Sequence, residues 1–418
     1  MPDKEEMLKK MQKMAEGAHS DPSLIGDAEY WSEIKLSSDI LTDAVAKHAL
    51  GLVYTGMADA GETLQCICDI DKFADDGWAK SWSAMACKLQ SQAEAYEAKG
   101  HAQSAATAYL RASTYWRVML MNYTDIHSSK VQEYAQIYMD CYERYLSLSG
   151  YPGEYIEIPY EDTFLPGHIY RSPYAKGKAP LLVITPGRDT WAEDTRWVYD
   201  EALRRGIHCV IYDGPGQGLA LRMQGLTFRP DWEHVVTPVL DYALEKLRGG
   251  VDPDRIGLMG MSFGGFLNTR AAAFDSRFKV MVADPGNLAW GGQIKQRLQM
   301  ILQIPEEQRP PFMNFMLDDY AWKQGVPKED VPADLDRYDN TDVVELVTCD
   351  TLVLDGAAEV QPGAAKQYFD ALRCPKDYHL FDFDSTAQCH CQTGGYAPAS
   401  EFIMNWIEEK LYRLRRFR

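Results

Sequence analysis

Basic residues are scarce in this sequence. The 418 residues include 43 lysines and arginines against 61 aspartates and glutamates, so the formal net charge is -18. A protein that binds the phosphate backbone of nucleic acid needs a basic surface, and we therefore exclude nucleic acid as a partner. The one dense basic run, Arg413–Arg418, is interpreted as a solvated tail.

Long apolar runs are also missing. No window of about 18 residues is both apolar and uncharged, and the stretch Met1–Gly17 is charged. We therefore expect neither a secretory signal nor a membrane-spanning helix, and no membrane partner. Nine scattered cysteines, an odd number, suit a reducing compartment better than a disulfide framework. These features predict a cytoplasmic protein.

Two cysteine clusters resemble metal ligands, but neither has a partner. Cys66–Cys68 and Cys389–Cys391 lack a second ligand pair at matching spacing, so we expect no metal site. The loop Asp213–Gly218 is rich in glycine, but it lacks the Lys-Ser/Thr of a P-loop and the spacing of a dinucleotide site. We therefore expect no cofactor, and interpret this loop as a tight turn beside the binding pocket.

Proline is absent between Asp27 and Leu148. Apolar residues in this stretch recur at three-to-four spacing, which predicts a helical domain over residues 1–150. Gly100 separates the helical stretches 81–99 and 101–123, as expected for a helical hairpin. We expect this domain to cover the substrate, and some of its aromatic side chains to line the pocket. The candidates are Trp82, Tyr115 and Trp116.

Short β-branched runs begin after Tyr151–Gly153. Residues 155–158 and 168–170 alternate and predict an antiparallel edge pair, and apolar strands then alternate with helical segments. This order predicts an α/β domain over residues 151–418 with a doubly wound, mostly parallel sheet. Residues 287–340 break the rhythm and are interpreted as a helical lid insertion.

The candidate nucleophile lies in Gly260–Gly265, with the sequence Gly-Met-Ser-Phe-Gly-Gly. A predicted strand precedes it and a predicted helix follows it, which is the context of a nucleophile elbow. Glycines on both sides of Ser262 allow the sharp turn that raises the hydroxyl above the sheet. We predict Ser262 as the catalytic nucleophile.

A serine hydroxyl needs a base and an acid, which in this fold follow the serine in the order acid, histidine. Only His379 and His390 follow Ser262. His379 falls inside a predicted strand, whereas His390 falls in a loop after it, so we predict His390 as the general base. The acid is Glu359 or Asp355, of which Glu359 is favoured because the turn Gly356–Glu359 presents its carboxylate to the histidine.

The reaction also requires N–H donors for the developing oxyanion. We expect these donors to be the backbone N–H of Phe263 and one from the loop after the strand ending at Ile184, where Gly187 and Arg188 are the candidates. The Arg188 side chain is expected either to hold an acidic substrate group or to form a surface ion pair.

Taken together, these residues resemble the α/β-hydrolases with an N-terminal helical domain, which include 2,6-dihydroxypseudooxynicotine hydrolase and the fungal yellowish-green-type polyketide-shortening hydrolases. The resemblance also rests on residues 27–31, 100–101, 108–113, 213–218, 221–222, 225–233 and 390–392. It implies an α/β-hydrolase fold and a triad of Ser262, an acid and His390. It also implies cleavage of a carbon–carbon bond next to a ketone. Substrate-binding residues are then expected to be Arg188, Asp189, Trp232 and Glu233.

The sequence leaves several functions open. The leading hypothesis is a serine hydrolase that cleaves a β-diketone, ester or lactone in an aromatic or polyketide-like small molecule. The alternatives are an acyltransferase or carboxylesterase, an acyl-peptidase, and a hydrolase-like binding protein without activity. We also consider a homodimer possible.

Overall fold

The computed structural model describes residues 28–37, 40–73 and 76–413. The charged stretch Met1–Gly17, Asp27 and the arginines after Arg413 lie outside the described residues.

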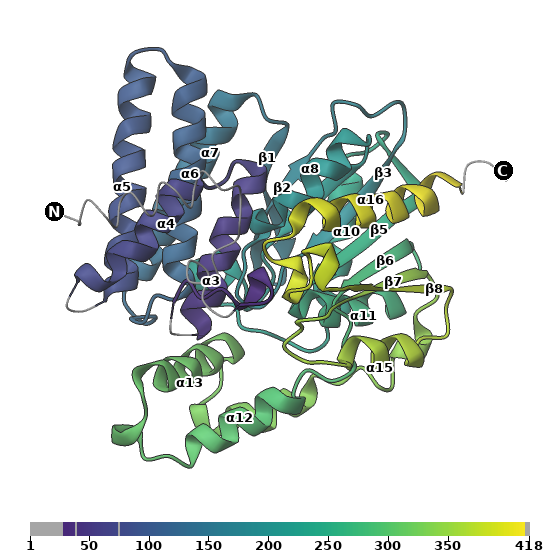
Figure 1. The fold of residues 1–418 in the computed structure, drawn as a ribbon. Coiled ribbons are helices and arrows are strands. Elements are labelled where there is room, and N and C mark those ends of the chain that lie inside the picture. Colours follow the sequence, from purple (N-terminus) through teal and green to yellow (C-terminus); the bar gives the residue numbers. More distant parts are fainter. Residues whose placement is uncertain (1–27, 38–39, 74–75, 414–418) are drawn as a thin grey trace, which may run out of the picture.

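Helices make up the first part of the described chain. They are α3 (Ile40–Gly51), α4 (Ala60–Asp69), α5 (Gly77–Ala98), α6 (Ala102–Met121) and α7 (Lys130–Ser149). The predicted hairpin is confirmed, because α5 and α6 lie side by side (Figure 1) and Gly100 turns the chain between them with a φ of 77°. Such a left-handed conformation favours glycine.

The first strand begins at Gly153 and belongs to an eight-stranded sheet of order β1-β2-β4-β3-β5-β6-β7-β8. The strands are β1 (Gly153–Tyr160), β2 (Thr163–Tyr170), β3 (Ala179–Thr185), β4 (His208–Tyr212), β5 (Val251–Met261), β6 (Phe278–Asp284), β7 (Asp350–Gly356) and β8 (Lys376–Phe381). The predicted antiparallel edge pair is β1 with β2, and β2 also pairs antiparallel with β4. All other pairings are parallel, so the predicted doubly wound, mostly parallel sheet is confirmed.

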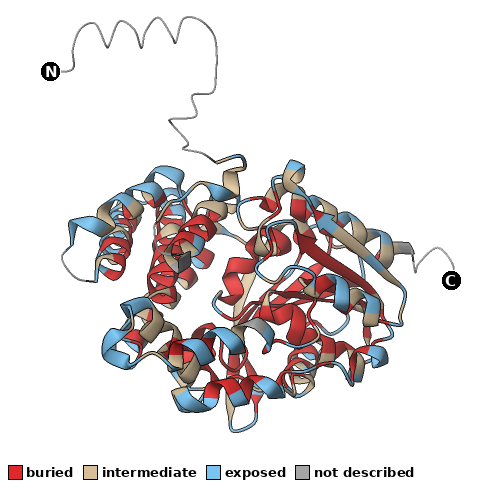
Figure 2. Ribbon diagram, turned by 60° about the horizontal axis from the view of Figure 1, so that its bottom comes forward, coloured by how far each residue is buried: buried red, intermediate tan, exposed pale blue. Residues whose placement is uncertain are grey.

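Alternate residues of the strands enter two separate cores, as the period of two requires. Leu182 and Ile184 of β3 join a core shared with the helical part, α8 (Arg196–Arg204) and α16 (Tyr396–Arg413). Leu181 and Val183 face the other side, with α10 (Glu233–Lys246) and α11 (Phe263–Phe274). Both faces of the sheet are therefore buried (Figure 2). Because one core is continuous with the helical part, the two parts of the chain pack directly together.

The remaining helices connect or extend this framework. They are α9 (Gly218–Gln224), α12 (Gly292–Leu302), α13 (Pro311–Gln324), α14 (Val331–Asp334) and α15 (Ala364–Ala371). Helices α12, α13 and α14 lie between β6 and β7, within the predicted insertion. Figure 1 shows α12 and α13 outside the sheet, on the side where α3 lies. The carboxyl ends of β3, β5, β6 and β7 meet at one edge of the sheet, which is where ligands bind in such folds.

Candidate active site

Ser262 occupies a sharp turn between β5 and α11. Its φ of 53° and ψ of -122° lie outside the regions that non-glycine residues normally adopt. A side chain at Gly260 would collide with the backbone of Gly264, and one at Gly264 would collide with the carbonyl of Thr185. The two flanking glycines are therefore required for the turn, and the structure has the strand–turn–helix geometry that the motif predicts.

The hydroxyl of Ser262 lies in hydrogen-bond contact with His390. The Nε2 atom of His390 is 2.8 Å from Ser262 Oγ, and its Nδ1 atom is 2.7 Å from Glu359 Oε1. His390 lies in a short 3₁₀ turn after β8, and Glu359 lies in the loop after β7. Three loops at the carboxyl edge of the sheet thus place a hydroxyl, an imidazole and a carboxylate in one line.

The electrostatics of this line favour an ion pair between Glu359 and His390. Burial alone would raise the pKa of Glu359, but the charge of His390 and its hydrogen bond outweigh burial and lower it. Burial alone would lower the pKa of His390, but Cys391 and Glu359 raise it well above its ordinary value. The pair is thus suited to accept and hold a proton from Ser262.

The alternative acid, Asp355, is not in contact with the histidine. Its carboxylate accepts hydrogen bonds from the Tyr378 hydroxyl at 2.7 Å and from the backbone N–H of Gly356 at 2.9 Å. Of the two acids predicted, the structure brings only Glu359 to His390.

The loop after β3 lies against Ser262. A Cβ at Gly187 would be 2.9 Å from Ser262 Cβ, so only glycine allows this approach. The Gly187 N–H donates to Thr190 Oγ1 at 3.0 Å. By contrast, the backbone N–H groups of Arg188 and Phe263 make no hydrogen bond to any residue in the described part of the chain. Of the candidate donors, Arg188 and Phe263 are therefore free for an oxyanion, whereas Gly187 is occupied.

A side chain from the glycine-rich loop holds this segment in place. Gln217 donates from Nε2 to the carbonyl oxygens of Pro186 and Gly187, at 2.7 and 3.0 Å. It is fully buried. The sequence predicts a tight turn beside the pocket here, but it does not reveal the supporting role of Gln217, because glutamine itself carries no motif signal.

The guanidinium group of Arg188 is engaged by the insertion. Its Nη1 atom donates to Asp319 at 2.6 Å and to Asp189 at 2.8 Å, and its plane covers the Tyr320 ring at 3.5 Å. Lys323 of α13 also pairs with Asp319, at 2.9 Å. Arg188 is nearly buried, so it forms an internal ion-pair cluster rather than the surface pair or substrate contact that we expected.

A cavity of about 300 Å³ opens onto Ser262 and His390. Its walls come from the helical part, the loop after β3, the insertion and the start of α16. The helical part contributes Ala44, Val45, His48, Met121 and Asn122. Arg188 and Asp189 line it, as predicted, although Arg188 does so with its side chain already paired.

Several residues expected at the cavity lie elsewhere. Trp82 and Tyr115 pack on each other at 5.6 Å inside the helical core, and Trp116 stacks on Tyr134, so the prediction that these aromatic residues line the cavity is wrong. Trp232 is fully buried and donates to the Tyr212 hydroxyl, and Glu233 pairs with Arg270. The structure does not place Trp232 or Glu233 at this cavity, because both stabilise the packing of α10.

The described residues give no sign of a metal centre. Among them, no three histidine, cysteine or acidic side chains lie close enough together to hold an ion. Nor does any helix in the described ranges have the length and apolar character needed to cross a membrane.

Comparisons with known proteins agree with this geometry. The family described as "Alpha/beta hydrolase family" matches residues 181–397. Hydrolase LUC6 of a Fusarium species is 36% identical over 241 residues, covering 55% of this chain and 57% of that protein. The 20-hydroxy-prefusarin hydrolase FUS2 of Gibberella moniliformis is 34% identical over 249 residues, covering 57% and 59% of the two chains. The chain thus spans a little over half the length of these curated relatives.

Among solved structures, 2,6-dihydroxy-pseudo-oxynicotine hydrolase aligns with a TM-score of 0.71 at 19% identity. The alignment covers 86% of this chain and 95% of that one. It therefore includes the helical part as well as the sheet.

Proposed function

The chain belongs to the alpha/beta hydrolase family, and from this membership and the geometry above we propose that it is a serine hydrolase with the triad Ser262, His390 and Glu359. The observation that carries the proposal is the continuous hydrogen-bond line through these three side chains, at 2.8 and 2.7 Å. We propose that its substrate is a β-diketone, an ester or a lactone in an aromatic or polyketide-like metabolite.

Each residue then has a defined step. His390 Nε2 accepts the proton of Ser262 as Oγ attacks the substrate carbonyl carbon, and Glu359 stabilises the imidazolium that forms. The free N–H groups of Arg188 and Phe263 donate to the oxyanion of the tetrahedral intermediate. His390 returns the proton to the leaving group, and water then releases the acyl group by the same steps.

The bond that breaks depends on the stability of the leaving group. An alkoxide or phenolate leaves from an ester or lactone, whereas a carbon–carbon bond breaks only if the leaving carbanion is stabilised as an enolate. A β-diketone supplies this enolate, because its second carbonyl takes the charge. The cavity supports a small, largely apolar substrate, since its walls include Met121, Trp197, Phe315 and Met316.

Names of the relatives support the substrate class. One curated relative is named for hydrolysis of 20-hydroxy-prefusarin. We propose that this chain acts on a compound of comparable type.

The test is a substrate panel. Purified protein is incubated with β-diketones, lactones and aryl esters, and products are identified by mass spectrometry, with Ser262→Ala as the control. The proposal expects hydrolysis of at least one class by wild type and none by Ser262→Ala. Equal product formation by the two proteins would refute it.

A further inference from the structure

A second line of acid, histidine and hydroxyl lies in the wall of the same cavity. His48 Nδ1 is 2.9 Å from the Tyr396 hydroxyl, and His48 Nε2 is 3.8 Å from Asp194 Oδ2. All three residues line the cavity that opens onto Ser262. They come from α3, from the turn before α8, and from the start of α16, so the line joins the helical part to the sheet part.

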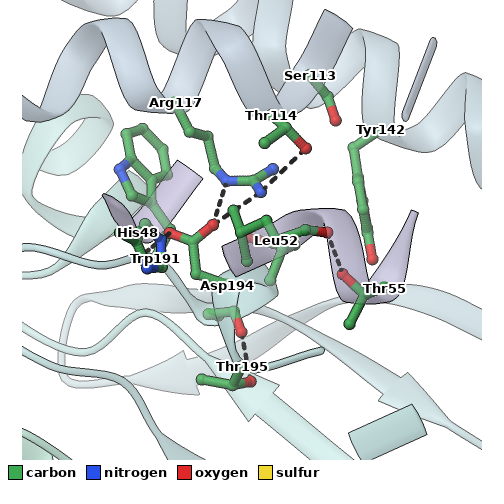
Figure 3. Close-up of polar contacts among 12 residues, drawn as sticks. His48, Leu52, Thr55, Ser113, Thr114, Arg117, Tyr142, Trp191, Asp194 and Thr195 are labelled. Carbon is green, nitrogen blue, oxygen red and sulfur yellow. Dashed lines mark hydrogen bonds and ion pairs between the residues drawn. The ribbon is translucent and has the colours of Figure 1, made fainter. Parts of the chain in front are cut away.

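The acid end of the line is held by a buried ion pair. Arg117 of α6 donates to Asp194 Oδ1 from Nε and Nη2, at 3.2 and 2.8 Å. The backbone N–H of Trp191 donates to Asp194 Oδ2 at 3.0 Å. Figure 3 shows His48 and Arg117 approaching this carboxylate from different elements. Asp194 therefore remains charged, and burial, which would raise its pKa, is outweighed mainly by Arg117.

The hydroxyl end is held by close packing. The Tyr396 ring stacks on Trp197 with centroids 4.7 Å apart. A Cβ at Gly51 would lie 2.8 Å from the Tyr396 ring, so α3 approaches this ring as closely as glycine allows. The position of the hydroxyl is thus fixed before any substrate binds.

The direction of the hydrogens follows from the charges. The carboxylate of Asp194 favours a proton on His48 Nε2, the ring nitrogen that faces it. Nδ1 then accepts a hydrogen bond from the Tyr396 hydroxyl. Burial raises the pKa of Tyr396 well above its ordinary value, so the hydroxyl keeps its proton. Its oxygen has two lone pairs. The Thr393 side chain takes at most one of them, and the other remains for a ligand.

We propose that Tyr396, aligned by His48 and Asp194, is a subsite that accepts a hydrogen bond from a hydroxyl group of the substrate. In such a chain every donor points the same way, and each hydrogen bond strengthens the next. The group that fits is an enolic hydroxyl, because the enol of a β-diketone carries an O–H close to the carbonyl that Ser262 attacks. This substrate class rests on the proposed function.

The experiment measures binding as inhibition of ester hydrolysis. The probes are benzoylacetone, which forms an enol, and its analogue with both α-hydrogens replaced by methyl groups, which cannot. Each is assayed as a competitive inhibitor of p-nitrophenyl butyrate hydrolysis by wild type, Tyr396→Phe and His48→Ala. Tyr320→Phe removes a different hydroxyl of the same cavity and is the matched control. A second pair, hydroxyacetophenone and methoxyacetophenone, tests a phenol in place of an enol.

The readout is the ratio of the two inhibition constants within one protein, so a general loss of activity cancels. In wild type we expect the enol to bind at least about tenfold more tightly than its analogue. Tyr396→Phe should reduce this preference about tenfold, His48→Ala should reduce it less, and Tyr320→Phe should retain it. Because the phenyl ring of the Tyr396→Phe variant can still stack on Trp197, a structural role alone would not change the ratio.

Three outcomes overturn the inference. An unchanged ratio in Tyr396→Phe contradicts the subsite while the hydrolase assignment stands. A preference confined to the phenol pair contradicts an enolic substrate. Absence of ester hydrolysis by wild type removes the proposed function, and the inference falls with it.

Discussion

Replacing Glu359 by glutamine tests the acid of the triad with almost no change in shape. The carboxylate oxygen Oε1 lies 2.7 Å from His390 Nδ1 and accepts the backbone N–H of Val360 at 2.6 Å. The backbone N–H of Gln361 also donates to this carboxylate. A glutamine has one acceptor oxygen and no charge, so it cannot satisfy all three donors or stabilise the imidazolium. The loss of such an acid lowers turnover by roughly 10³–10⁴-fold, which corresponds to ~4–5 kcal/mol.

The assay is hydrolysis of p-nitrophenyl butyrate, and the matched control is Asp355→Asn. Asp355 bonds to Tyr378 and to Gly356 and not to His390, so its replacement is expected to reduce kcat less than about fivefold. The pH profile adds a second readout. Burial lowers the pKa of His390, but Cys391 and Glu359 raise it further, and turnover requires the neutral ring. Activity therefore rises with pH through this pKa, and Glu359→Gln should move the rise to lower pH. A larger loss in Asp355→Asn than in Glu359→Gln would refute the reasoning.

Three further substitutions test the stability and the lid. Burial raises the pKa of Asp284 to about 7, so the unfolded state releases this proton first and wild type loses stability as pH rises from about 4 to about 7. Asp284→Asn should remove this loss, by up to ~4 kcal/mol, measured as the Tm difference between about pH 5 and pH 8. Arg117→Met leaves Asp194 buried without its partner, and denaturant unfolding should show a loss of ~3–5 kcal/mol. Asp319→Ala should cost ~3 kcal/mol and lower kcat, because Asp319 holds the loop after β3; Asp318→Ala, which breaks only a partly exposed pair, should cost ~1 kcal/mol or less. Equal losses at positions 318 and 319 would contradict this account of the lid.

Local features of the sequence predicted the nucleophile and much of the sheet. The turn at Ser262 needs glycines two positions away on either side, and this requirement is visible in five residues. The choice of Glu359 over Asp355 likewise followed from a short turn, and the structure places Glu359 against His390. In both cases the residues that define the geometry are neighbours in the chain.

Contacts between distant segments could not be predicted in the same way. The His48–Tyr396 hydrogen bond joins residues 348 positions apart, and neither residue lies in a motif. Trp82 and Trp116 lie on amphipathic helices, and helical spacing shows that such a face is buried but not whether it packs on a helix or on a cavity. The sequence assigns Arg188 to solvent or substrate because its partner, Asp319, lies in the insertion, whose position no local pattern defines.

The most direct test of the central claim is covalent labelling of Ser262. Wild-type protein is treated with a fluorophosphonate probe and analysed by intact mass and peptide mapping. The account predicts one adduct, on the peptide that contains Ser262, none in Ser262→Ala, and strongly slowed labelling in His390→Ala. An adduct on a different residue, or labelling of Ser262→Ala at the wild-type rate, would contradict it.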